Sequence, residues 1–452
     1  MGDRTMRILI STGHLGTAPS SPESFHAGME TGPDYVVADG GSSDPGPVYL
    51  GEDTSMGHFA REEVELFLTA SRKRGIPLII GSAGDTGSNS RVDLFVGMVK
   101  ELAGQHRIPK FKVGHFYSEI PKEYLKRKIR DGKELKGLGG FPGLTLDEID
   151  QATRIVAVAG VHPFIKLLDR GADVIIGGRC GDINFTAAPC IRAGFPEALA
   201  YHMGKMIECA SLVAEPFMGK ETVIGTVSHE DIKITPYHPG QRCTVASAVG
   251  HSMYERENPF NEYTVGGMLD MSQCQYEQFN ERICRITGAQ WIPSEELRVK
   301  IEGAKKVGQR YMGFVGIRDP YVVQHVDEVI EWCKNSVAKR FGKERYELYF
   351  HVFGKNGILK EMEPIKEIRS HELGIVVEGL AATDELAEKL TDFAVRMFFL
   401  ARIPGVKGTA GTAATTKKTM RSSPGYMWNV NHTVPIDDPM ELFPVHMTEA
   451  GV

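Results

Sequence analysis

The sequence predicts an α/β fold in the N-terminal half, with a mostly parallel sheet flanked by helices, followed by an α+β C-terminal domain. In the first half, short apolar runs alternate with segments of helical period, which is typical of βαβ units. After about residue 215, alternating polar and apolar runs and longer loops replace that pattern. A length of 452 residues is too great for one ordinary domain. We therefore expect an α/β catalytic or ligand-binding domain over residues 1–215 and an α+β domain over residues 216–452.

Six segments of the first half are short, apolar and bounded by turn residues, so each is expected to form a parallel strand. They are Met6–Ser11, Tyr35–Ala38, Pro77–Gly81, Lys110–Val113, Ile155–Ala159 and Ala172–Ile176. Helices are expected between them, and Thr145 and Glu148 have the spacing of a capping box that opens one of these helices. In such a sheet, ligands bind outside the carboxyl ends of the strands.

The second half contains two segments with a helical period, Tyr321–Phe341 and Thr383–Arg402. Residues 403–430 are rich in Gly, Thr and Pro and show no sustained period, which predicts a long loop or a set of short edge strands. The basic cluster Lys417–Arg421 in this stretch could close over an anionic substrate as a lid, or could be a solvated basic loop.

Composition excludes several classes of protein. The formal charge of −6 is too mildly acidic to predict nucleic acid or a membrane surface as a partner. No segment approaches 18 continuous apolar residues, and the first apolar run is too short for a signal peptide, so we expect a cytoplasmic protein. The seven cysteines form no CxxC pair, which favours free buried thiols over disulfides or a structural zinc site.

The loop after the second expected strand is a candidate binding loop. It carries Asp39, two glycines, Ser42, Ser43 and Asp44. Glycines let the backbone approach a ligand, and the side chains could bind a carboxylate or a phosphate, or a metal through Asp39 and Asp44. A turn with solvated side chains is the alternative, because Asp, Gly and Ser also suit turns.

A second such loop, Gly81–Asn89, follows the third expected strand and runs into a helix. Amides at a helix N-terminus together with hydroxyls form an anion site. The loop has neither a Walker A ending nor a GxGxxG spacing, so it implies no nucleotide. The first expected strand delivers His14 to the same edge as a candidate acid or base, although a lone histidine is more often solvated. The residues of this loop expected to bind substrate are Asp85, Thr86, Ser88 and Asn89.

The stretch Gly171–Ser211 is typical of a buried strand, a Gly-rich turn and a long helix over Pro196–Val213. The turn carries Arg179, a natural bidentate partner for a substrate carboxylate, and Asp182. On the helix, His202 and Cys209 are seven residues apart and are expected on one face.

Glu208 lies three residues after Lys205 on the same expected helix. It is either paired with Lys205 or held at the mouth of a pocket as a general base. Farther along the chain, Lys355 lies in a KNG turn, which is first a hairpin signal and second a candidate for substrate binding.

Four segments resemble the acyclic terpene utilisation proteins of the AtuA type. They are Asp34–Asp44, Ile76–Asn89, Gly171–Asp182 and Ala198–Ser211, with one departure at Ala210, where the family more often has glycine. The resemblance covers nearly the whole chain and implies catabolism of a carboxylate or its thioester, without a fixed reaction. Relatives often carry, or are encoded beside, a small ferredoxin-like domain. This chain, which stops at Val452, is expected to lack that domain, so the resemblance also implies a small ferredoxin-like partner subunit.

These residues together predict a lyase, a hydratase or dehydratase, acting on a small hydroxy or unsaturated carboxylate or its CoA thioester. Arg179 and the two loops would bind the anion, and His202 with Glu208 or Asp182 would move the proton α to a carbonyl. A double-bond isomerase would use the same parts, and a non-catalytic acyl- or anion-binding subunit of a complex is a further alternative. No redox-cofactor fingerprint is present, so no cofactor is expected, although a divalent metal on Asp39, Asp44 and Asp182 stays open. A homo-oligomer is also expected.

Overall fold

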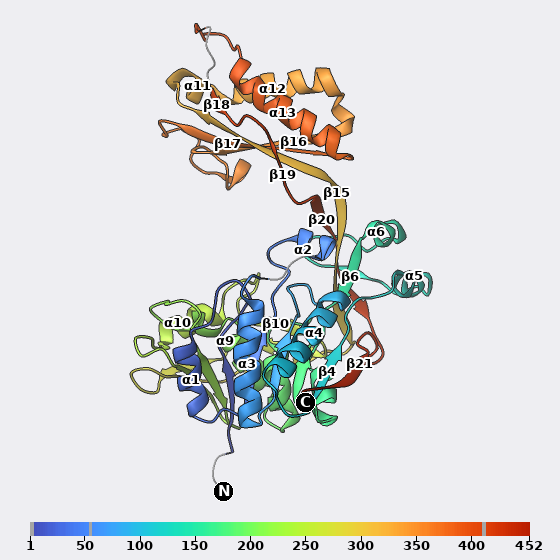
Figure 1. Cartoon of the computed structure of the whole chain (residues 1–452), viewed down its shortest axis with the longest axis vertical. Helices are drawn as coiled ribbons and strands as arrows, with labels where there is room; N and C mark the ends of the chain where they lie inside the picture. Colours follow the sequence, from blue (N-terminus) through green and yellow to red (C-terminus); the bar gives the residue numbers. More distant parts are fainter. Residues whose placement is uncertain (1–3, 54–56, 409–412) are drawn as a thin grey trace. The chain divides into compact units, whose positions relative to one another are not determined.

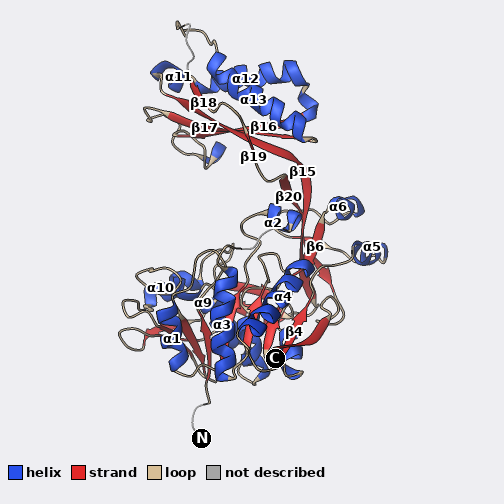
Figure 2. Cartoon of the chain, viewed as in Figure 1, coloured by secondary structure: helices blue, strands red, loops and turns tan. Residues whose placement is uncertain are grey.

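The computed structural model describes residues 4–53, 57–408 and 413–452, and the chain divides into two compact units (Figure 1). Unit 1 comprises Met1–Ala304 and Trp428–Val452, and unit 2 comprises Lys305–Met427. The described residues form thirteen α-helices and several sheets, one of which mixes parallel and antiparallel strands (Figure 2). The mixed α/β character expected from the sequence is therefore confirmed.

The main sheet of unit 1 has five parallel strands at its centre. Their spatial order is β1 (Met6–Ile10), β2 (Tyr35–Asp39), β3 (Leu78–Gly81), β7 (Val174–Ile176) and β4 (Phe111–Phe116). Antiparallel strands extend the sheet at both sides. Beyond β1 lie β8 (Val223–Val227), β9 (Ile232–Pro236), β13 (Cys284–Thr287) and β12 (Gln275–Gln278), and beyond β4 lies β21 (Val445–Ala450).

The sixth parallel strand expected from the sequence is absent from this sheet as described. The segment expected at Ile155–Ala159 forms β6 (Arg154–Ala157), which pairs antiparallel with β15 (Arg298–Ile317). An apolar run shows that a segment is buried, but its pairing partner lies about 145 residues away in the sequence and is not visible in the run itself.

The boundary expected at residue 215 falls between a 3-10 helix, η1 (Ala210–Val213), and strand β8. Strand β8 pairs with β1 along its whole length, from Met6↔Val227 to Ile10↔Val223. The texture of the sequence changes at this point because the sheet continues with antiparallel strands. The compact units divide instead after Ala304 and again after Met427.

Two layers of helices cover the main sheet, and side chains alternate between them along each strand. Ile79 packs into the core under α7 (His162–Asp169), α8 (Asn184–Arg192) and α9 (Glu197–Ile207), whereas Leu78 and Ile80 belong to the other core. That second core lies under α1 (Pro22–Glu30), α3 (Ala60–Arg74) and α4 (Asn89–Gln105). Successive side chains of a strand point to opposite faces of the sheet, and here both faces are covered by helices. The result is three layers, with the sheet between two layers of helices. Both faces are covered, so the open edge at the carboxyl ends of the strands remains for a site.

The remaining elements of unit 1 surround this edge or extend the unit. The capping box predicted at Thr145 and Glu148 is confirmed at the start of α6 (Leu146–Gln151). A separate three-stranded sheet has the order β10 (Asn261–Thr264), β11 (Gly267–Asp270) and β14 (Gln290–Pro293). The other elements are α2 (Pro47–Glu52), α5 (Lys122–Arg130), α10 (Val245–Ser252), β5 (Lys136–Gly137) and β20 (Gly425–Pro435).

Unit 2 follows the order strand, helix, strand, strand, helix, strand. These are β15, α12 (Val326–Phe341), β16 (Tyr346–Phe353), β17 (Leu373–Ala381), α13 (Asp384–Leu400) and β18 (Ala413–Thr415). In space the strands lie as β16-β17-β15-β18, all antiparallel, which is the ferredoxin-like arrangement. The chain thus contains one ferredoxin-like unit itself, and a separate partner subunit stays a prediction.

Local details of unit 2 refine two expectations. The helix expected over Tyr321–Phe341 is divided at His325 into α11 (Pro320–Gln324) and α12. The stretch 403–430 forms short strands, β18, β19 (Met420–Arg421) and the start of β20, while residues 409–412 lie outside the described residues. Arg421 of the basic cluster is paired with Asp384 at 2.8 Å. A lid role for this cluster stays a prediction.

Candidate active site

The loops that follow β2, β3 and β7 pack against one another through glycines at the carboxyl edge of the sheet. A methyl group on Gly41, whose φ is +133°, would lie 2.3 Å from Oδ1 of Asp85. A methyl on Gly87, whose φ is +57°, would lie 2.0 Å from the amide nitrogen of Arg179. Only residues without a side chain permit both the left-handed backbone and this closeness. The convergence of the three loops at one place, expected from the sequence, is therefore present.

Arg179 is the centre of a buried ion-pair network in this place. Its Nε lies 3.0 Å from Oε2 of Glu302, and its Nη1 lies 3.6 Å from Oδ1 of Asp182. Its Nη2 also donates a hydrogen bond to Oγ of Ser43 at 3.2 Å, and Nη1 donates one to Oγ of Ser82 at 3.3 Å. The two side chains of the main pair are 8% and 6% exposed. Arg179 therefore holds the three loops against residues 298–304 of β15, the part of this strand that belongs to unit 1.

The charge states of Arg179 and Glu302 depend on the charged groups that surround them. Burial alone would lower the pKa of Arg179, but the carboxylates of Glu302 and Asp182 raise it above its usual range. Burial alone would raise the pKa of Glu302, but Arg179 and Lys300 lower it to about 2. Both partners are consequently charged at neutral pH, and the guanidinium is already matched by carboxylates of the chain.

Glu208 occupies the turn after α9, next to Lys205. The Lys205 ammonium donates a hydrogen bond to Oε1 of Glu208, and the hydroxyl of Tyr254 donates another to the same oxygen at 2.9 Å. Glu208 and Lys205 are 4% and 1% exposed. Burial raises the pKa of Glu208 to about 7, with Lys205 opposing the rise and Asp182 adding to it. Of the two alternatives stated for Glu208, the pairing with Lys205 is present, and it leaves the carboxyl able to exchange a proton near neutral pH.

Helix α9 ends earlier than the sequence predicted, and this end places Glu208. The single helix expected over Pro196–Val213 is α9 followed by η1, and Ala210, the first residue of η1, has a φ of +50°. This left-handed conformation suits glycine, which accounts for the glycine that the resembling proteins more often have there. Cys209 therefore lies beyond the helix. Its thiol is 3.0 Å from the hydroxyl of Tyr254, and burial raises its pKa to about 12.

Asp39, at the end of β2, is a second carboxyl with a shifted pKa. It is 3% exposed and accepts a hydrogen bond from the amide of Gly41 at 3.1 Å. Burial raises its pKa well above the usual value, and the charges of Asp182 and Glu208 add to the rise. The pKa of Asp182 is raised as well, mainly because its inner oxygen is buried, while Arg179 opposes the rise. Acidic groups outnumber their cations here, which favours the protonated form of Asp39 more than usual.

His14 and Asp85 form a dyad beside these carboxyls. Nε2 of His14 lies 2.5 Å from Oδ1 of Asp85, and the two side chains are 30% and 5% exposed. Asp85 contacts Gly41, and Gly13 contacts the backbone of Cys209, so the dyad adjoins both Asp39 and the Glu208 turn. A buried carboxylate that holds a partly exposed imidazole fixes its orientation, as in hydrolytic triads.

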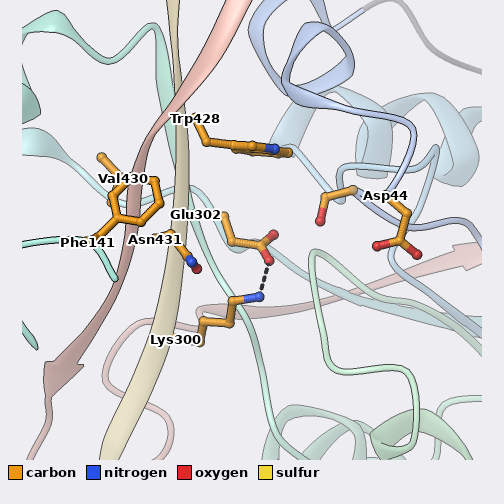
Figure 3. A pocket seen from close by; sticks show the side chains of 8 residues that line it. Asp44, Phe141, Lys300, Glu302, Trp428, Val430 and Asn431 are labelled. Carbon is orange, nitrogen blue, oxygen red and sulfur yellow. Dashed lines mark ion pairs between the residues drawn. The ribbon is translucent and has the colours of Figure 1, made fainter. Parts of the chain in front are cut away.

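A cavity of about 310 Å³ lies beside the ion-pair network (Figure 3). Ser43 and Asp44 of the β2 loop line it, together with Phe141, Lys300, Glu302, Trp428, Val430 and Asn431. Figure 3 shows the Lys300 ammonium directed at the Glu302 carboxylate, and the two lie 2.7 Å apart. Lys300 is 44% exposed and therefore presents a cation to whatever enters. The cavity combines an aromatic wall with charged groups, as small-molecule sites do.

Several residues expected to bind substrate form bonds within the chain. The N-terminus of α4, expected to bind an anion, receives protein carboxylates: the amide of Asn89 donates to Glu119 at 2.9 Å, and Oγ of Ser88 donates to Asp53 at 2.5 Å. Lys355 lies in unit 2, where its ammonium pairs with Asp327. Ser42 and Thr86 accept hydrogen bonds from amides two residues ahead, those of Asp44 and Ser88. A substrate role for these residues stays a prediction.

His202 lies in the protein core and away from the cluster of carboxyls. It is 0% exposed, its Nε2 is 3.2 Å from Oγ of Ser252, and its Nδ1 is 3.6 Å from Sγ of Cys274. Burial lowers its pKa to about 3, so the ring is neutral at physiological pH. With its ring buried against Ser252 and Cys274, it is placed to hold α9 against its neighbours. A role of His202 in proton transfer stays a prediction.

His202→Ala is accordingly expected to lower the free energy of unfolding by at least about 2 kcal/mol, because it leaves a cavity and removes a buried hydrogen bond to Ser252. Urea denaturation at pH 7 measures this loss. His371→Ala, at an exposed position of unit 2, is the matched control and is expected to change stability by less than about 0.5 kcal/mol. Equal stability of the two variants would contradict a core role for His202.

Three features of the site were not predicted from the sequence. Lys300 and Glu302 alternate with apolar residues along β15, which is typical of side chains that face solvent. The neighbouring sequence therefore does not indicate that Glu302 is buried against Arg179. Tyr254 follows α10 in a run of polar residues typical of a surface turn. Trp428 lies in the stretch expected to be a loop. The only available signal was the concentration of charge at Glu255 and Arg256 beside Tyr254.

The ligand atoms of Glu208, Cys209 and His251 lie within 4.8 Å of one another, and theirs is the one such group found in the described part of the chain. The three aspartates expected to hold a metal do not form such a group there. Tyr254 already bridges Glu208 and Cys209, and the Lys205 ammonium contacts Glu208. A positive charge is therefore supplied to the carboxylate by the chain itself.

Residues 55–434 match the model of a family described as acyclic terpene utilisation family protein AtuA. The chain belongs to this family. The resemblance inferred from the sequence is thus confirmed. Within the AtuA match lie Arg179, Glu208, Tyr254 and Glu302, whereas His14 and Asp39 precede it.

Neither the curated proteins nor the solved structures returned a match to this AtuA-family chain. In the described segments, none of the helices has the length and apolar character needed to cross a membrane.

Proposed function

We propose that this chain is a hydro-lyase that adds water to, or removes it from, a small hydroxy or unsaturated carboxylate or its CoA thioester. The observation that carries the proposal is a pair of buried carboxyls, Asp39 and Glu208, with raised pKa values. Burial raises the pKa of Glu208 to about 7, and it raises the pKa of Asp39 well above its usual value, which favours the protonated form of Asp39. Buried carboxyls with shifted pKa values commonly divide the roles of base and acid.

In the dehydration direction, ionised Glu208 takes the proton from the carbon α to the carbonyl. The electron pair of that C–H bond forms the double bond to the β carbon, and the bond from the β carbon to its hydroxyl breaks. Asp39 gives its proton to the departing hydroxyl, which leaves as water. In the hydration direction each group runs its step in reverse, which the near-neutral pKa of Glu208 permits.

The surrounding groups fit the other needs of this reaction. The carbonyl oxygen gains negative charge as the α proton leaves, and the Lys205 ammonium and the Tyr254 hydroxyl adjoin Glu208 as donors. Lys300 presents a partly exposed cation to the carboxylate of the substrate, or to the phosphates of its CoA moiety, in the cavity of Figure 3. The His14–Asp85 dyad is a second group able to relay protons to solvent.

Isotope exchange tests the proposal across a panel of candidate substrates. The protein is incubated in D2O and separately in H2(18)O with 3-hydroxy acids, their 2,3-unsaturated counterparts and the corresponding CoA thioesters. The masses of the recovered compounds are then measured by mass spectrometry. We expect one deuterium at the α carbon and one 18O at the β carbon per turnover in at least one pair. Deuterium without 18O would instead indicate a double-bond isomerase, and no exchange with any compound would favour a non-catalytic binding subunit.

A further inference from the structure

A second cavity, of about 430 Å³, lies in unit 1 beside the turn that carries Asp182. Its lining is mostly apolar and includes Leu138, Val158, Ile183, Tyr263 and Val265. A cavity of this size falls within the range of small-molecule sites. The proposed proton transfer uses none of these side chains.

The second cavity adjoins Asp182, which is paired with Arg179 in the carboxyl cluster. Gly181 and Ile183, the two neighbours of Asp182 in the chain, both line it. Lys300 lines both this cavity and the cavity of Figure 3. A ligand whose polar head lies at the carboxyl cluster could therefore extend an apolar portion into the second cavity.

Most polar side chains that line the second cavity are paired with one another or with nearby residues. Asn184 accepts a hydrogen bond from Thr264 at 2.9 Å and donates one to the carbonyl of Gly181 at 3.2 Å. Arg298 donates to Glu296 at 2.8 Å. The other two charged groups are paired likewise, Glu262 with Arg256 and Lys300 with Glu302.

This pairing decides the chemistry of the occupant. A polar occupant would lose its hydrogen bonds to water and find few partners in return, which is unfavourable. An apolar occupant gains the free energy of removing its surface, and that of the lining, from water. The cavity therefore selects hydrocarbon.

We infer that this cavity binds the aliphatic chain of the substrate, so that the protein acts on carboxylates or thioesters with a hydrocarbon tail. That the tail belongs to the reacting molecule rests on the proposed function, whereas binding of a chain to the cavity does not. Val158, Ile183 and Val265 would then set the accepted chain length.

A series of straight-chain carboxylates tests the inference. The dissociation constants of butanoate, hexanoate and octanoate are measured by calorimetry with the full chain. Each added methylene is expected to tighten binding about fourfold, so that octanoate, with four more methylenes, binds about 250-fold more tightly than butanoate. Equal affinities across the series would overturn the inference.

Val158→Phe locates the binding, because Val158 is half-buried and lines the cavity. The added ring is expected to reduce octanoate affinity at least tenfold while changing butanoate affinity less than threefold. Val307→Phe, at an exposed position of unit 2, is the matched control and should leave the whole series unchanged. Tyr263→Ala, 72% exposed before substitution, removes lining without filling the cavity and serves if Val158→Phe does not fold. It should weaken octanoate binding about threefold and leave butanoate binding unchanged.

An unchanged octanoate affinity in folded Val158→Phe, or in Tyr263→Ala where the first does not fold, would overturn the assignment to this cavity. Failure of the two proposals can be told apart. If the reaction is not hydration, isotope exchange fails while the chain-length series holds. If the cavity does not bind the chain, exchange proceeds with short and long substrates alike.

Discussion

Replacing Arg179 by methionine is expected to lower the free energy of unfolding by about 3–5 kcal/mol, because the substitution leaves the buried carboxylate of Glu302 without its partner. The loss is expected to be large since Glu302 is 6% exposed and its pKa of about 2 depends on Arg179 first and on Lys300 second. Methionine keeps much of the volume of the side chain, so the missing charge dominates. Urea denaturation at pH 7, followed by fluorescence, measures the change.

The control for Arg179→Met is Arg61→Met. Arg61 pairs with Glu101 at 2.9 Å, a geometry like that of the buried pair, but the two side chains are 40% and 57% exposed. An exposed pair contributes about 0–1 kcal/mol. The double variant Arg179→Met, Glu302→Leu should recover part of the loss, since it removes the unpaired charge as well. Equal losses for Arg179→Met and Arg61→Met would show that the guanidinium of Arg179 does not fasten the three loops.

Glu208→Gln is expected to reduce turnover by about 10²–10⁴-fold, the usual contribution of a general base, while octanoate still binds. The amide keeps the shape of the carboxyl and can still accept the hydrogen bonds of Lys205 and Tyr254, but it cannot take a proton. Deuterium incorporation at the α carbon measures the effect directly. Glu344→Gln, at an exposed position of unit 2, is the control and should retain full activity. Wild-type exchange rates in Glu208→Gln would remove Glu208 from the mechanism.

The pH dependence of two properties follows from the pKa of Glu208. As the base must be ionised, α-proton exchange should rise with pH through about 7 and then level off. The contribution of Glu208 to the free energy of unfolding changes in the opposite direction, since it decreases as the pH rises. The pKa of about 7 in the folded chain exceeds the ordinary value of 4.5, so this contribution is fully present below about 4.5 and is lost as the pH rises through 7. Both slopes should be absent in Glu208→Gln, and a rate profile that is flat between pH 5 and 8 in the wild type would contradict the assignment.

The positions of Asp39, Asp85 and Arg179 at one edge follow from local sequence. Asp39 ends a short apolar strand, Asp85 and Arg179 lie in the loops that follow two others, and the carboxyl ends of parallel strands lie at the same edge. The glycines beside them permit the close packing of the three loops that is observed. The family follows in the same way, since its characteristic segments are continuous in the chain.

His202 shows where helical spacing fails as a guide. A separation of seven residues puts His202 and Cys209 on one face only if the helix continues, and α9 ends at Ile207. The face that carries His202 is covered by Ser252 and Cys274, which lie 50 and 72 residues farther along the chain. Which face of a buried helix meets solvent is decided by what packs on it, and periodicity does not contain that information.

For this protein, then, the sequence alone determines the α/β character of the first half, five of its parallel strands, the loops at their carboxyl ends and the family. The tertiary structure decides which charges are buried together: Glu302 reaches Arg179 from 123 residues away, and Tyr254 reaches Glu208 from the end of α10. The physical reason is that a pKa depends on burial and on neighbouring charges in space. A glutamate in a helical pattern is an ordinary surface residue until distant segments remove it from water, and only then does Glu208 become able to exchange a proton at neutral pH.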